Sequence, residues 1–130
     1  GPRSASVPRE EVVVLAPLPR ELPDRLPDYL PGRIRTLDPA LWPPFEDYEQ
    51  LGVTATLPRY GMDLATTNPV IDPDRVRWLA ERTTTRPLAA RHAHLTTWRG
   101  IVHVVDGRHT LAAHLATGGE RIPVKLVRPR

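Results

Sequence analysis

The sequence contains no cysteine at any of its 130 positions. This absence excludes a disulfide framework, a zinc site built on thiolates and a cysteine nucleophile, and it suits a reducing compartment such as the cytoplasm. Long apolar runs are also missing, so no segment approaches the roughly 20 residues that span a bilayer, and the start lacks the pattern of a signal peptide. We therefore expect a soluble cytoplasmic protein without a membrane partner.

Lysine is nearly absent too, since 17 of the 18 basic residues are arginine. The net charge of +3 is unevenly distributed: residues 1–74 carry seven arginines and twelve acidic residues, a net of −5, whereas residues 75–130 carry +8. A basic half attracts nucleic acid, nucleotides or an acidic protein surface. Alternatively, codon bias supplies the arginines and the two halves pack together. The candidate partner-binding residues are Arg75, Arg82, Arg86, Arg91 and Arg99.

Proline is abundant, and 10 of the 16 prolines lie in residues 1–44. Leucines recur every four residues through residues 16–31, but prolines interleave at the same period and exclude a helix longer than one turn. The segment predicts an extended strap whose leucines anchor it to a core; a proline-rich ligand for a partner is the alternative. We expect a proline-rich N-terminal extension at 3–52, a domain at 53–130, and a tag remnant at 1–2.

Residue patterns predict a mixed α+β domain after this strap. Asp72 is placed as the N-cap of a helix that Pro73 begins. Its apolar face holds Val76, Leu79 and Ala80, while Arg75, Trp78 and Arg82 share another face. The other expected elements are strands at 11–15, 33–37, 87–95, 101–105 and 122–127, an aromatic turn at 41–45, a loop at 96–100 and a helix at 108–117.

The turn at Gly107 is the strongest candidate site. A glycine between a strand and a helix lets backbone amides approach a phosphate, and the helix amino end carries unsatisfied donors with partial positive charge. Gly107, Arg108, His109 and Thr110 therefore form a candidate phosphate cradle. His109 and Asp106 are the catalytic candidates, His109 as a proton relay and Asp106 as a cap or a holder of metal-bound water. A purely structural helix entry is the alternative.

The order of landmarks around this turn resembles the ParB/sulfiredoxin superfamily. Val104-Val-Asp-Gly-Arg-His-Thr-Leu-Ala-Ala-His-Leu-Ala-Thr-Gly118 followed by Ile122-Pro-Val is similar to its second box, and Asn68-Pro with the helix after Asp72 resembles its earlier segment. The resemblance covers about residues 53–127. It implies a small mixed sheet with packed helices and a nucleotide, CTP or ATP with Mg²⁺, at Gly107 and His109.

Departures from the family pattern shape the functional expectation. Thr110 stands where the family has an arginine, and a hydroxyl cannot replace a bidentate guanidinium on phosphate. Without cysteine, sulfiredoxin chemistry is excluded. We therefore expect a stand-alone binding module, of the kind phages or mobile elements encode, acting on a host protein or nucleic acid with a degenerate nucleotide site. The alternatives are a nucleotide-dependent switch or hydrolase, and a metal-assisted nuclease using Asp106 with His103 or His109.

All five histidines fall between residues 92 and 114. His92 and His94 alternate onto one strand face, and His103 on the next strand faces them only in some registers. A four-residue turn would set His94 opposite His103, and a five-residue turn would pair His94 with Val102. These three histidines are weak zinc candidates, because a metal site normally needs a further His or carboxylate in reach.

Overall fold

The structure is a computed structural model that describes residues 18–41, 48–82 and 92–129. Three expectations fall wholly or mostly outside these residues: the strand at 11–15, the aromatic turn at 41–45 and the first part of the strand at 87–95. Arg86 and Arg91 also lie outside them.

One mixed sheet of six strands runs through the described residues, in the order β2-β4-β6-β5-β7-β3. The parallel pairs are β2 with β4, β4 with β6 and β5 with β7, and the antiparallel pairs are β5 with β6 and β3 with β7. The expected α+β fold with a mixed sheet is confirmed. The strands are β2 Ile34–Thr36, β3 Tyr48–Pro58, β4 Leu64–Thr66, β5 Ala93–Trp98, β6 Ile101–Asp106 and β7 Arg121–Pro129.

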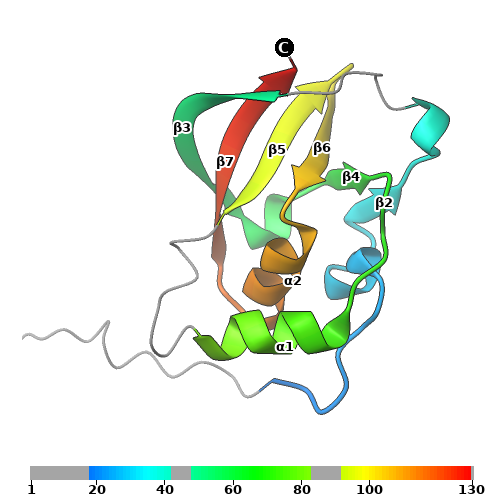
Figure 1. Cartoon of the computed structure of the whole chain (residues 1–130), viewed down its shortest axis with the longest axis vertical. Helices are drawn as coiled ribbons and strands as arrows, with labels where there is room; N and C mark the ends of the chain where they lie inside the picture. Colours follow the sequence, from blue (N-terminus) through cyan, green and yellow to red (C-terminus); the bar gives the residue numbers. More distant parts are fainter. Residues whose placement is uncertain (1–17, 42–47, 83–91, 130) are drawn as a thin grey trace, which may run out of the picture.

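Both α-helices lie on one side of this sheet (Figure 1). The helix α2, Arg108–Ala116, packs against β5 and β7, and the helix α1, Pro73–Glu81, packs on α2. Three one-turn 3₁₀ helices complete the described elements: η2 Leu26–Tyr29, η3 Pro39–Leu41 and η4 Arg59–Gly61. Neither α-helix in the described residues has the length or apolar character to cross a bilayer.

Helix α1 forms as its residues predict. Asp72 is its N-cap, and its Oδ1 accepts a hydrogen bond from the Asp74 backbone N–H at 3.0 Å. Pro73 occupies the first turn, where its missing N–H is tolerated. The apolar stripe is confirmed as well, because Val76, Leu79 and Ala80 are the buried residues of the helix.

Helix α2 is buried on more sides than its sequence indicates. Five consecutive residues of the helix are buried, Leu111, Ala112, Ala113, His114 and Leu115, and they cover more than one face. The reason is its position between the sheet and α1, since a helix covered on two sides needs no polar face there.

The described part of the proline-rich strap, residues 18–31, contains one helical turn, η2, and no longer helix. Leu26 and Leu30 are buried in the core, and Leu18 and Leu22 pack partly against it. Tyr29 Oη donates to the Pro23 carbonyl at 2.7 Å. Burial, with help from the Asp24 carboxylate, raises the pKa of Tyr29 to about 12, which keeps this donor protonated.

The part of the predicted extension that follows the strap belongs to the sheet. Strand β2, predicted within residues 33–37, pairs in parallel with β4, and β3 runs continuously across residue 52. Residues assigned from the sequence to an extension at 3–52 therefore contribute strand β2 and the first part of β3 to the same sheet as the domain at 53–130.

The hairpin between β5 and β6 differs from both expected registers. Its turn is only Arg99-Gly100, with positive φ at both residues (51° and 78°), so β5 continues to Trp98. In a two-residue hairpin such paired positive φ angles match the strand twist. His103 consequently lies opposite Thr96, and His94 lies opposite Asp106 after a bulge. Arginine rarely adopts this backbone conformation, which is why the sequence did not indicate so short a turn.

Candidate functional site

Gly107 is required at the start of α2 by its conformation and by its surroundings. It is the N-cap with φ 76° and ψ 31°, in the left-handed region. A Cβ there would lie 3.0 Å from Ala93 Cα and 3.2 Å from the His92 carbonyl oxygen, both backbone atoms of the strand beside it. Only glycine satisfies both conditions, so this turn needs its glycine even without a ligand.

Asp106 is engaged by the turn that it precedes. Its Oδ1 accepts a hydrogen bond from the Gly107 backbone N–H at 2.8 Å. Its Oδ2 lies 3.9 Å from His94 Nδ1, across the hairpin. The carboxylate thus occupies one of the amides that a phosphate in the predicted cradle would use.

His109 joins the amino ends of the two helices. Its Nε2 accepts a hydrogen bond from the Asp72 backbone N–H at 3.0 Å, across 37 residues of sequence. Burial lowers the pKa of His109, the Arg108 and Arg75 guanidiniums lower it further, and the Asp72 carboxylate opposes them. The histidine is therefore held neutral, with Nε2 as an acceptor, which is the form this contact needs.

Arg108 reaches away from the amino end of its own helix. Its Nε donates to the Val70 carbonyl at 2.7 Å, two residues before the N-cap of α1. Thr110 lies in the same first turn and is partly buried. Together Arg108 and His109 tie α2 to the segment that leads into α1, and we call this set of contacts the helix joint.

A small hollow lies beside the turn. Its volume is about 140 Å³, and its walls are the segment after β4 and the end of β6. Thr66 Oγ1 donates to the Asn68 carbonyl and accepts from the Asn68 N–H, which fixes this wall. The lining residues are Thr66, Thr67, Asn68, Val104, Val105, Asp106 and Arg108.

The three candidate zinc ligands are not gathered around one point. His103 is 2% exposed and faces Thr96. Burial is the main cause that lowers the pKa of both His103 and His92. Residues 18–41, 48–82 and 92–129 hold no group of three or more histidine or carboxylate side chains able to share a metal ion. The hairpin register explains this, because it pairs His94 with Asp106 instead of with a second histidine.

The candidate partner-binding arginines separate into two places. Arg75 and Arg82 are exposed on α1 beside Trp78, whose indole is 43% exposed. The Arg82 guanidinium carbon lies 3.9 Å from the centroid of the Trp78 ring. Arg99 is on the β5–β6 turn, at 5.5 Å from the Trp98 ring.

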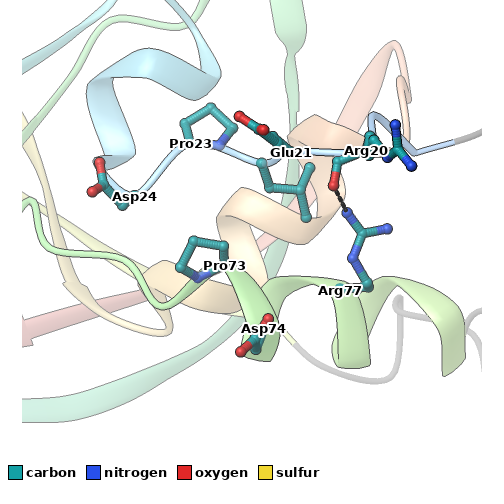
Figure 2. A pocket seen from close by; sticks show the side chains of 8 residues that line it. Arg20, Glu21, Pro23, Asp24, Pro73, Asp74 and Arg77 are labelled. Atoms are coloured by element: carbon teal, nitrogen blue, oxygen red, sulfur yellow. Dashed lines mark hydrogen bonds between the residues drawn. The ribbon is translucent and has the colours of Figure 1, made fainter.

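A second, larger hollow lies between the strap and the amino end of α1 (Figure 2). Its volume is about 410 Å³. Arg77 reaches across from α1, and its Nη2 donates to the carbonyls of Pro19 at 2.7 Å and Arg20 at 3.0 Å. No local sequence pattern indicates this role of Arg77, because its two partners lie 58 and 57 residues away along the chain.

Comparisons with known proteins do not extend this picture. No protein-family model, curated protein or solved structure matches the chain.

Proposed function

We propose that this chain is a binding module that works by contact with another protein, and that the turn at Gly107 serves as the structural joint between its helices. A ParB/sulfiredoxin-like origin, encoded by a phage or mobile element, remains part of this proposal. The nucleotide site of that superfamily would then be degenerate here.

The engagement of the turn's own side chains is the observation that carries the proposal. Asp106 holds the Gly107 amide, Arg108 holds the Val70 carbonyl, and His109 accepts the Asp72 amide. A phosphate would have to displace the first contact and compete for the other two. Each such contact contributes on the order of 1 kcal/mol, and the loss of these contacts would weaken nucleotide binding by that amount.

The distribution of charge favours a protein over a nucleic acid. Exposed arginines stand beside carboxylates: Arg128 Nε donates to Glu49 Oε1 at 2.6 Å, and Arg33 lies 3.6 Å from Asp63. A polyanion favours an uninterrupted basic track. Paired charges of opposite sign and an exposed tryptophan, Trp78 on α1, suit the mixed chemistry of protein interfaces.

Calorimetric titration tests the proposal against nucleotide binding. We expect no saturable heat when millimolar CTP, ATP or GTP with Mg²⁺ is added to the chain. A saturable heat that disappears in Arg108→Met would contradict the proposal. Gel-shift assays with random single- and double-stranded DNA and RNA form the second arm, and salt-sensitive retention would indicate nucleic acid as the partner instead.

A nucleotide-binding switch or phosphate-ester hydrolase is the second candidate. The hollow beside the turn favours it, because Asn68 and Arg108, which belong to the two segments that resemble the family, both line it. At about 140 Å³ the hollow is smaller than the roughly 300–1,000 Å³ typical of ligand pockets, and suits a single phosphate group. Plasmid cleavage that requires Mg²⁺ and is lost in His109→Ala would support this candidate and its nuclease form.

A further inference from the structure

We infer that the outer face of α1 binds a second copy of this chain, with the two helices parallel and related by a two-fold axis along their length. This inference rests on the proposed function, and it names one partner for the protein contact proposed there.

The exposed residues of α1 form two stripes of opposite charge on either side of Trp78. With 3.6 residues per turn, Arg75 and Arg82 lie about 40–60° to one side of Trp78, and Asp74 and Glu81 lie about 40–60° to the other. All five residues are exposed. The remaining polar residue of the helix, Arg77, is held by the strap.

Two-fold symmetry makes this pattern complementary to itself in only one orientation. When the helices face each other in parallel, the basic stripe of one copy lies opposite the acidic stripe of the other. Arg75 then meets Asp74 of the second copy, and Arg82 meets Glu81 of the second copy. In each pair the two residues differ by only about 1.5 Å in their position along the helix axis. In an antiparallel arrangement arginine would face arginine and carboxylate would face carboxylate, which is destabilising.

Trp78 supplies the apolar centre of this contact. Its side chain would lie on the two-fold axis against the same residue of the second copy, and Arg82 already stacks on the ring. Tryptophan and arginine are the residues that most often carry binding energy at interfaces. Because α1 has only nine residues, about 13 Å of helix, the contact is small, and we expect a weak, concentration-dependent dimer.

The acidic stripe distinguishes this surface from a nucleic-acid site. Asp74 and Glu81 flank Trp78 as closely as the arginines do, so a phosphate chain stacked there would meet repulsion along one side. A second copy meets attraction on both sides. Charge complementarity with itself is therefore the property of the face that selects its occupant.

A charge-exchange experiment tests the inference. One variant, Arg75→Glu with Arg82→Glu, makes both stripes acidic; the other, Asp74→Lys with Glu81→Lys, makes both basic. Analytical ultracentrifugation should show the unaltered chain approaching dimer mass as concentration rises. Each variant alone should dissociate about tenfold more readily, and an equimolar mixture should regain association. Arg99→Glu, on the distant hairpin turn, is the matched control and should associate like the unaltered chain.

Each other outcome overturns the inference. A chain that stays monomeric at millimolar concentration, or variants that associate no differently from it, would contradict the contact. A mixture no more associated than its components would contradict the charge pairing. Should the basic double variant fold poorly, Trp78→Ala must still abolish the dimer. If the chain is monomeric and calorimetry shows no nucleotide binding, only this inference is overturned. If calorimetry shows saturable nucleotide binding, the proposed function is overturned, whatever the oligomeric state.

Discussion

The helix joint and the outer face of α1 both contain arginines, but these side chains are hydrogen-bonded within the fold at the joint and exposed to solvent on the outer face. At the joint, Arg108 and His109 are bound to backbone groups of the segment before α1. On the outer face, Arg75 and Arg82 lie exposed beside Trp78. Arg108 and His109 thus make contacts within the fold, whereas Arg75 and Arg82 are exposed at the surface.

This difference shows why a motif alone does not define a site. A glycine followed by Arg-His at a helix start is suited to phosphate, yet here its side chains meet internal hydrogen-bond partners. If the contacts at the joint stabilise the fold, substitutions there should lower the free energy of unfolding. Substitutions on the outer face of α1 should leave it nearly unchanged.

The largest effect should come from Gly107→Ala. The new Cβ would meet the Ala93 backbone at 3.0 Å, and alanine disfavours a φ of 76°. We expect a loss of about 3 kcal/mol in the free energy of unfolding, measured by urea denaturation. Gly118→Ala is the control: it has a φ of 82° with no atom within 4 Å, so it should lose only about 1 kcal/mol. Equal losses would contradict a packed joint.

His109→Ala should have the next largest effect. It leaves the Asp72 N–H without its acceptor and removes a partly buried ring, and we expect a loss of about 1.5 kcal/mol. Thr110→Ala, in the same helical turn, should change the free energy of unfolding by less than about 0.5 kcal/mol. A His109→Ala protein as stable as the unaltered chain would show that this contact does not hold the helices.

Arg108 at the helix joint and Arg75 on the outer face of α1 are a matched pair of arginines. Arg108→Met loses the hydrogen bond to the Val70 carbonyl and should cost about 1 kcal/mol. Arg75→Met, on an exposed side chain, should cost less than about 0.5 kcal/mol. Thermal denaturation at matched protein concentration measures the stability of both variants. An Arg75→Met protein less stable than Arg108→Met would contradict the expected difference between the joint and the outer face.

The smallest effect should be a dependence of stability on pH. Because the pKa of His109 is lowered in the folded chain, the unfolded chain binds its proton first as pH falls. The stabilisation is fully present above the ordinary value of 6.5 and is lost as pH drops below it. His92 and His103 contribute in the same direction, so His109→Ala should make the slope shallower without removing it. An unchanged slope would argue against a neutral His109 acceptor.

Local signals predicted much of the fold. Asp72 and Pro73 defined the start of α1, and the described residues 18–31 contain no helix longer than one turn, as the interleaved prolines predicted. These features act through neighbours in sequence, so the sequence alone contains them. The pairing of the predicted extension with the sheet was missed, because β2 pairs with β4 through residues about 30 positions apart.

The position of the turn at Gly107 was predicted from the sequence, and its use as a phosphate site stays a prediction. The sequence placed Gly107 between a strand and a helix, and the structure does so too. That His109 accepts the Asp72 amide depends on how α1 and α2 pack, which no local pattern specifies. The histidine registers failed for a similar reason, since Arg99 adopts a conformation that its residue type rarely takes.

One pair of ¹⁵N–¹H NMR titrations observes the helix joint and the outer face of α1 in the same sample. Adding CTP with Mg²⁺ should leave the amides of residues 107–110 in place, while raising the protein concentration should shift the amides of residues 74–82 and the Trp78 indole. Saturable nucleotide shifts at residues 107–110, with α1 unmoved by concentration, would contradict the account.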